Sequence, residues 1–310
     1  MNTLTDAINH YLALRRGLGF KLIQVEYLLH HFATFMKQHD AAYITIELAL
    51  QWAVEPQQTN PAYWAKRLRA VRGFARHHSA TDPRTEIPAP GLLPYRPARA
   101  KPYLYSEDDI QHLMKAARAL PPRNGLRGWT YSCLLGLLAV TGLRISEALA
   151  LKRDDVDLNE GLLTIRQAKF AKSRLVPLHA STQAVLRTYG QRRDAYPACR
   201  HSIYFLISEK GTSLSASTVR GVFCKLSRQI GLRGPDDRHG PRLHDLRHRF
   251  AVEVLLRGYQ SDEAIERRLS ALSTFLGHTR VSDTYWYLSA CPELMGQAVR
   301  RLEKCWEIGS

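Results

Sequence analysis

Residues 133–149 carry the sequence CLLGLLAVTGLRISEAL, in which an apolar run of 11 residues ends at Arg144. The run is shorter than the roughly 20 apolar residues that a membrane span needs, and it therefore predicts a buried helix. The turn Thr141-Gly142 then places Arg144 at the start of a second helix. Burying an unpaired cation is costly, and Glu147 is a possible partner. Arg144 is thus either half of a structural ion pair or a functional cation.

Composition suggests the class of partner. The chain has 310 residues, about enough for two domains with separate cores. Its 44 Lys and Arg against 28 Asp and Glu leave a net charge of +16, which favours a polyanionic partner over a merely basic, soluble surface. The five cysteines are scattered without a CxxC pair, so neither a disulfide framework nor a zinc ribbon is predicted. With no signal peptide at its start, we expect a cytoplasmic protein without a membrane partner.

Residues 1–82 are predicted to form an N-terminal helical domain, because apolar residues recur there at helical spacing in four segments. The fourth helix follows Asn60-Pro61, a pair that suits the cap and first turn of a helix. Basic side chains surround its apolar stripe. They form either an ordinary solvated face or one that contacts phosphates, and the net charge favours the second. The residues expected to bind nucleic acid here are Lys66, Arg67, Arg69 and Arg72.

The next segment is rich in proline. Six of the 15 prolines fall between residues 83 and 102, mixed with basic residues. Proline at this density neither continues a helix nor donates to a sheet, so we predict an extended linker over residues 83–103. Its positive charge suits it to lie along a nucleic-acid backbone, where Arg99 and Lys101 are expected to bind.

Residues 104–310 are expected to form a second, helix-rich domain with a short β meander. Strand patterns cover residues 156–158, 162–166 and 175–178, with a turn over residues 159–161. Helical patterns cover further apolar segments at about residues 106–117, 129–140, 215–230, 244–256, 262–276 and 292–306. The predicted fold class is mainly α with a small antiparallel β meander.

One of these helices contains His244-Asp245-Leu246-Arg247-His248. His244 and Arg247 share a helix face, and an imidazole beside a bidentate guanidinium suits the oxygens of a phosphate. A metal site is the alternative, because His244 and His248 imitate the spacing of a zinc-binding helix, with Asp245 in the place of the usual glutamate. That alternative lacks an obvious third ligand and leaves the Arg247 cation beside the ion.

Two more groups complete a possible reaction centre. Gly277-His278 is followed nine residues after the histidine by Tyr287, which lies in the aromatic cluster 285–287, and the hairpin tip 168–172 carries two lysines. Alone, the aromatic cluster indicates packing and the lysines indicate an exposed turn. Together with the two arginines and His244, they suit attack on a phosphodiester. Cations neutralise the developing charge, a lysine protonates the departing 5′-oxygen, and a tyrosine is the nucleophile.

Four segments, in their order and spacing, resemble the signature boxes of tyrosine recombinases, the phage-integrase and Xer-like family. They are residues 141–149, 174–178, 244–251 and 276–278 with Tyr287. The resemblance implies a helical core-binding domain over residues 1–82 and a mixed α+β tyrosine-recombinase catalytic domain over residues 104–310. Residues 282–289 and 292–294 look closer to recombinases of mobile elements than to chromosomal resolvases.

The resemblance also implies roles for single residues. The catalytic residues that match the family's boxes are Arg144, Lys169, His244, Arg247, His278 and Tyr287. Tyr285 is the alternative nucleophile. Lys172 is the alternative lysine, because Ala168 and Phe170 stand where the family often has glycines. Lys172 and Arg174 are expected to bind DNA, and Glu147 is expected to be structural.

The implied activity is site-specific recombination of double-stranded DNA, for integration, excision or resolution. Strands are cut and rejoined through a 3′-phosphotyrosine, with no metal or other cofactor. Four protomers are expected to assemble on two DNA segments, and the helix from Pro292 on docks either on a neighbouring protomer or on its own domain. The other functions considered are a catalytically silent DNA-binding accessory protein or regulator, a type IB topoisomerase, and a metal hydrolase built on His244 and His248.

Overall fold

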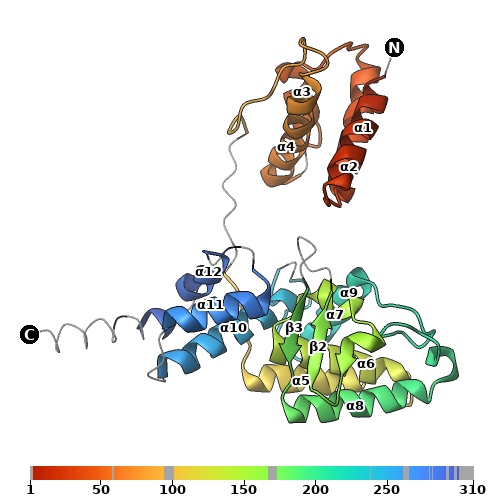
Figure 1. The fold of residues 1–310 in the computed structure, drawn as a ribbon, viewed down its shortest axis with the longest axis vertical. Helices are drawn as coiled ribbons and strands as arrows, with labels where there is room; N and C mark the ends of the chain where they lie inside the picture. Colours follow the sequence, from red (N-terminus) through yellow and green to blue (C-terminus); the bar gives the residue numbers. More distant parts are fainter. Residues whose placement is uncertain are drawn as a thin grey trace, which may run out of the picture. The chain divides into compact units, whose positions relative to one another are not determined.

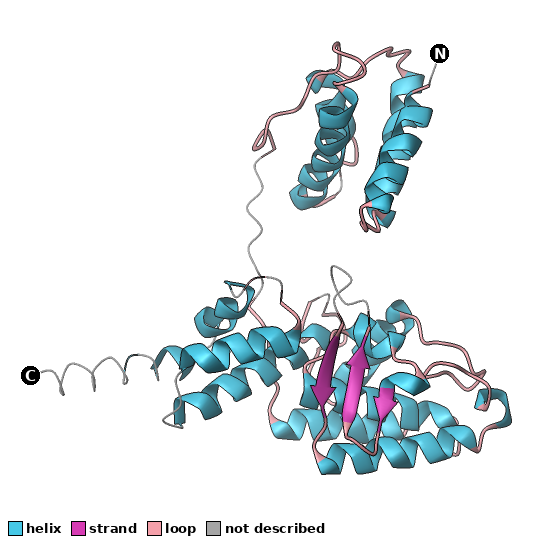
Figure 2. Cartoon of the chain, viewed as in Figure 1, coloured by secondary structure: helices cyan, strands magenta, loops and turns pink. Residues whose placement is uncertain are grey.

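The structure is a computed structural model that describes residues 3–57, 59–93, 101–166, 173–237, 239–260, 265–278, 280, 282–290, 293–296 and 299. Over these residues the fold is mainly α-helical with a three-stranded antiparallel sheet, which confirms the predicted fold class (Figure 2). The chain divides into two compact units, Met1–Ala100 (unit 1) and Lys101–Ser310 (unit 2) (Figure 1). None of the described helices is long and apolar enough to cross a membrane.

Unit 1 contains four helices, α1 (Leu4–Gly17), α2 (Ile23–Gln38), α3 (Ile46–Val54) and α4 (Pro61–His78). At the start of α4 the Asn60 side chain accepts a hydrogen bond from the backbone N–H of Ala62, as the Asn60-Pro61 pair predicts. The apolar faces of the four helices meet in one core around Phe32, Trp52 and Phe74.

Part of the predicted linker packs on the helices of unit 1. The guanidinium of Arg72 donates to the carbonyl oxygens of Pro88 and Ala89, at 2.7 Å each. The carboxylate of Glu86 accepts from the backbone N–H of Ile46 at 2.6 Å, and Leu93 packs against the core. The prolines of this segment lack an N–H, but the carbonyls of the segment still accept hydrogen bonds, so the linker assignment is corrected for residues 86–93.

Unit 2 contains eight α-helices and three strands over its described residues. The helices are α5 (Glu107–Arg118), α6 (Leu126–Thr141), α7 (Ile145–Ala150), α8 (Ala180–Asp194), α9 (Ala216–Gln229), α10 (Leu243–Gln260), α11 (Ile265–Leu276) and α12 (Ser282–Ala290). The strands are β1 (Val156–Asp157), β2 (Leu162–Ile165) and β3 (Arg174–Pro177), and two short 3-10 helices are η1 (Arg153–Asp155) and η3 (Pro197–Cys199).

The core of unit 2 forms around α6 and the sheet. Helix α6, which contains most of the apolar run 133–143, is buried along most of its length and packs against α5, α8 and α10 (Figure 1). The strands are ordered β1-β2-β3, and their register pairs Leu163 with Val176, both fully buried. Packing of a central apolar helix against its neighbours thus fixes the position of the turn that follows it.

That turn depends on Gly142, which ends α6 with a φ of 59°. A Cβ atom at this position would lie 2.6 Å from Cδ1 of Phe250 on α10. Both the left-handed backbone and the close approach of α10 therefore require glycine. Helices α10, α11 and α12 form a second core that includes Leu294, so this residue of the predicted docking segment packs on its own unit.

Candidate active site

Arg144 stands at the amino end of α7, directly after the Gly142 turn. Its backbone N–H donates to one carboxylate oxygen of Glu147 at 3.0 Å, and its side chain donates to the other at 2.7 Å. A second side-chain nitrogen donates to the carbonyl of Gly277 at 3.2 Å. The Arg144 side chain is 26% exposed, so it is both held in place and open to a ligand.

Arg247 on α10 is the most deeply buried cation of the site, with 2% exposure. Its Nη1 donates to the carbonyl of Gly142 and its Nη2 donates to the carbonyl of Leu276, both at 2.8 Å. Burial lowers the pKa of this guanidinium from its ordinary value. The carbonyls at the end of α11 thus accept hydrogen bonds from both arginines.

His278 follows α11 and hydrogen-bonds through both ring nitrogens. Nη2 of Arg247 donates to its Nε2 at 2.9 Å, which requires Nε2 to be unprotonated. Its Nδ1 therefore carries the proton and donates to the hydroxyl of the buried Thr284 at 2.8 Å. Burial, with the charges of Arg247 and Arg144, lowers the pKa of His278 to about 4, so this ring is neutral at pH 7.

Tyr287 on α12 lies beside His278 and is only 3% exposed. Its ring stacks on that of His278 with centroids 5.9 Å apart, and the edge of His248 meets it at 5.1 Å. Tyr287 also lies close enough to Arg247 to influence the pKa of that guanidinium. Tyr285, the alternative nucleophile, is 52% exposed, so the structure places Tyr287 rather than Tyr285 among the arginines.

His244 and His248 lie one turn apart on α10 with ring centroids 5.1 Å apart. Desolvation and the Arg247 charge lower the pKa of His244. Burial and His244 lower the pKa of His248 to about 4, and its buried Nδ1 has no hydrogen-bond partner. Asp245, the acidic residue of the metal alternative, is instead paired with Arg242, and no three potential ligands gather among the described residues.

Glu147 and Arg174 form a buried ion pair next to Arg144. Nη1 and Nη2 of Arg174 donate to the two carboxylate oxygens at 3.1 and 2.8 Å. Burial alone would raise the pKa of Glu147, but the hydrogen bonds and charges of Arg174 and Arg144 outweigh it and lower the pKa to about 2. Glu147 is therefore an anion that holds two arginines.

Five of the six expected catalytic residues come together in unit 2. They are Arg144, His244, Arg247, His278 and Tyr287. The expected lysine, Lys169, and its alternative, Lys172, lie outside the described residues. The roles of all these residues remain predictions.

The residues expected to bind DNA have different surroundings. Lys66, Arg69 and Lys101 are exposed, and Arg99 lies outside the described residues. Arg72 is half-buried and bound to carbonyls of residues 88 and 89, and Arg174 is committed to Glu147. The assignment of Arg67 to DNA is wrong. Its guanidinium stacks 3.8 Å from the Trp52 ring centre, is 4% exposed and donates to the Trp52 carbonyl, because position 67 faces the core of unit 1.

Two contributors to the site were not found from the sequence. Thr284 fixes the tautomer of His278, but a threonine in the first turn of a helix carries no functional signal by itself. Arg174 is expected from the sequence to bind DNA, whereas its partner in the structure is Glu147, 27 positions earlier in the chain. Neither contact follows from spacing, because each depends on tertiary packing.

Known proteins resemble this chain in sequence and in fold. A sequence model of the phage integrase family matches residues 104–293. The y4rB protein of Sinorhizobium fredii is 53% identical over 99% of each chain, and tyrosine recombinase XerD of Caulobacter vibrioides is 30% identical over 84% of this chain and 81% of its own. The Tn1549 transposon integrase, solved with transposon right end DNA, has a TM-score of 0.67 at 13% identity and covers 96% of this chain and 98% of its own, a likeness of fold. The chain belongs to the phage integrase family and is a tyrosine-type site-specific recombinase.

Proposed function

We propose that this recombinase cuts and rejoins DNA through a 3′-phosphotyrosine formed by Tyr287. The observation that carries the proposal is the position of this phenol, which is buried between the rings of His278 and His248, and His278 accepts a hydrogen bond from Arg247. The phenol oxygen bonds to phosphorus and passes its proton to a neutral imidazole of the site, while the bond between phosphorus and the 5′-oxygen breaks and that oxygen takes a proton from the lysine. The ester keeps the free energy of the broken bond, so the reverse attack by a 5′-hydroxyl rejoins strands without ATP.

The two arginines supply the electrostatic part of the reaction. Arg144 and Arg247 direct donors at one place, now occupied by the carbonyls of Leu276 and Gly277. We expect the non-bridging oxygens of a phosphate to take over such donors, because a phosphate carries full charge and a carbonyl does not. Preorganised donors of this kind stabilise the charge that develops in the transition state.

A lysine is expected to protonate the departing 5′-oxygen. Lys169 and Lys172 both precede β3, whose first residue, Arg174, contacts the site. General acid catalysis contributes about 10²–10⁴-fold to such steps. The variants Lys169→Ala and Lys172→Ala decide between the two lysines. Each is tested on two versions of the same DNA substrate, one with a poor leaving group and one with a good leaving group. The catalytic lysine is the one whose loss the good leaving group rescues.

DNA contact by unit 1 is proposed for the exposed basic face of α4. Lys66, Arg69 and Arg76 are exposed and lie on one side of the helix. Lys101 is exposed at the start of unit 2 and is proposed to contact the backbone as well. Solved relatives include a lambda integrase dimer bound to a COC′ core site, which supports double-stranded DNA as the partner.

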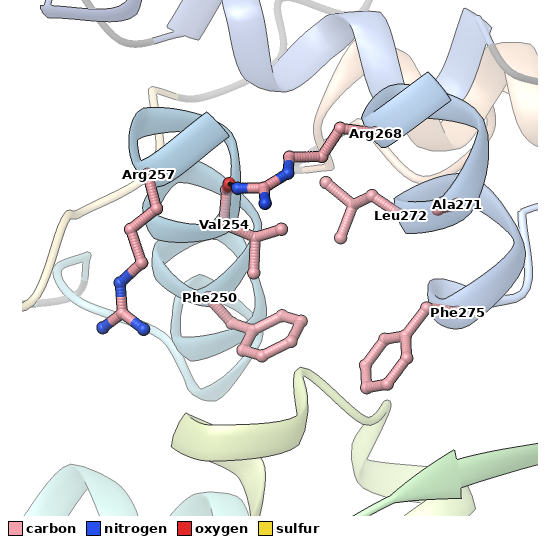
Figure 3. Close-up of a pocket in the computed structure, with 7 residues that line it drawn as sticks. All are labelled: Phe250, Val254, Arg257, Arg268, Ala271, Leu272 and Phe275. Carbon is pink, nitrogen blue, oxygen red and sulfur yellow. Dashed lines mark hydrogen bonds between the residues drawn. The ribbon is translucent and has the colours of Figure 1, made fainter. Parts of the chain in front are cut away.

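Self-assembly through the C-terminal segment is also proposed, with a tetramer as the active form. Figure 3 shows a groove between α10 and α11, lined by Phe250, Val254, Leu272 and Phe275, with Arg257 and Arg268 beside it. The sequence after residue 300 offers Leu302 and Trp306 for the apolar lining and Glu303 and Glu307 for the arginines. Removal of residues 300–310 is expected to abolish assembly on DNA while monomer binding persists.

The nucleophile is tested on a nicked suicide duplex whose site is selected from a random-sequence library by the wild-type protein. We expect a covalent protein–DNA adduct in EDTA from the wild type and from Tyr285→Phe, the matched control, and none from Tyr287→Phe. An adduct from Tyr287→Phe contradicts the assignment. Binding of the selected DNA without any adduct from the wild type favours the accessory-protein alternative.

A further inference from the structure

We propose that Arg174 is a positioning residue that locks the Arg144 and His278 segments together and anchors the strand following the lysine-bearing segment. This inference rests on the proposed function, because it assigns a role in the cleavage step attributed to Tyr287. It replaces the expectation that Arg174 binds DNA.

The guanidinium of Arg174 is engaged on both of its edges. Its Nη atoms bind both oxygens of Glu147, and its Nε donates to the carbonyl of Phe275 at 2.7 Å. The side chain is 11% exposed. A planar fork with several donors satisfies these acceptors at once, whereas the single ammonium of lysine does not. The contacts therefore specify arginine and leave little of the group for a DNA phosphate.

Glu147 transmits the effect of Arg174 to the catalytic arginine. One oxygen of Glu147 accepts from the side chains of both Arg144 and Arg174, and the other accepts from the Arg144 backbone and from Arg174. Without Arg174 this buried carboxylate loses half of its hydrogen bonds and one of its two cations. Since Arg144 is aligned by the same carboxylate, its guanidinium moves with Glu147.

Gly277 links Arg174 to the other side of the site. This residue has a φ of 67°, and a Cβ atom here would lie 2.9 Å from Nη1 and 3.1 Å from Cζ of Arg174. The guanidinium thus packs against the turn that delivers His278. The same turn supplies the carbonyl that Arg144 binds, so Arg174 holds α7 and the end of α11 in a single arrangement.

Arg174 also fixes the end of the lysine-bearing segment. It opens β3 and pairs with Ile165 of β2, and residues 167–172, which contain Lys169 and Lys172, connect these two strands. Arg174, the first residue of β3 after the two lysines, is therefore also the residue that binds Glu147. Displacement of a reacting group by about 1 Å can reduce a rate by 10²-fold, which makes such an anchor kinetically important.

The test compares Arg174→Lys with the wild type in single-turnover cleavage of the suicide duplex and in DNA binding at several salt concentrations. We expect cleavage to fall at least about 100-fold, the loss that a small displacement produces. The Kd and its salt dependence are expected to stay within twofold of the wild type. Arg187→Lys is the matched control, because Arg187 is exposed on α8 and also donates to a carbonyl, that of Leu158. It should cleave normally.

A double-mutant cycle separates positioning from a general loss of structure. If Arg174 acts through Glu147, Arg174→Lys costs much less in a Glu147→Gln background than in the wild type. Equal costs in both backgrounds, unchanged cleavage, or a smaller salt dependence of binding overturns the inference. Failure of the proposed function is distinguishable, because the wild type then gives no adduct at all.

Discussion

Three histidines stand among the arginines of unit 2, and the pKa of each is lowered. The hydrogen bond from Arg247 to Nε2 of His278 exists only while that nitrogen is unprotonated. At the scale of the residue, the site therefore combines permanent cations with imidazoles that are neutral at pH 7. Such an arrangement attracts a phosphate while leaving proton acceptors available.

Neutral buried histidines make stability depend on pH. The unfolded state takes up protons near pH 6.5, whereas His248 and His278 resist protonation until about pH 4, so stability falls as the pH falls between these values. Allowing for partial exposure, we expect a loss on the order of 1 kcal/mol for each histidine between pH 7 and pH 5. Denaturant unfolding of unit 2 at several pH values measures it.

His248→Gln should remove its share of this pH dependence, whereas His112→Gln, at an exposed position on α5, should leave it unchanged. Identical slopes for the wild type and His248→Gln would show that His248 titrates normally.

At the scale of the element, the turn between α6 and α7 sets the position of Arg144. Gly142 combines a left-handed backbone with a contact to Phe250, and its carbonyl accepts from Arg247. Gly142 therefore sets the positions of α6, α7 and α10 relative to one another. A side chain at position 142 would displace both Arg144 and Arg247.

Gly142→Ala is expected to destabilise unit 2 by about 1–3 kcal/mol and to reduce cleavage, because the strained backbone and the clash add. Gly190→Ala in the interior of α8 is the control, since a Cβ there meets nothing within 4 Å. It should be neutral or stabilising by about 0.5–1 kcal/mol. Thermal melting compares the two, and equal midpoints would contradict the importance of the turn.

The features that could be predicted from the sequence were those that depend on residues close together along the chain. The apolar run predicted buried α6, and the Asn60-Pro61 pair predicted the start of α4. The spacing of nine residues between His278 and Tyr287 matches the family pattern, and the two rings are in contact in the structure. The burial of Arg67 depends on Trp52 of another helix, and the binding of residues 86–93 depends on donors from Arg72 and Ile46. Such contacts arise from tertiary packing, which spacing along the chain does not reveal.

At the scale of the whole molecule, the net charge of +16 favours an anionic partner, but not every cation is available to bind it. Arg67 and Arg174 are used inside their own units, whereas Lys66 and Arg69 face solvent. Only the second kind releases counterions when DNA binds, and only such residues contribute to the salt dependence of affinity.

Lys66→Gln and Arg69→Gln are each expected to lower the slope of log K against log salt by about 0.9, the contribution of one phosphate contact. Arg67→Ala should leave the slope unchanged and lower the melting temperature of unit 1, because it removes a buried side chain that stacks on Trp52. Fluorescence anisotropy over a salt series gives the slopes. A reduced slope for Arg67→Ala would show that Arg67 does contact a DNA phosphate.

The phenol of Tyr287 and the guanidinium groups of Arg144 and Arg247 all come from one chain. If these groups act as proposed, each copy supplies all three of them itself. If several copies meet on DNA and only some act at a time, the alternation must come from disarming complete active sites in turn. The assembly would then control when each active site cleaves, and it would not need to complete one active site with residues from another copy.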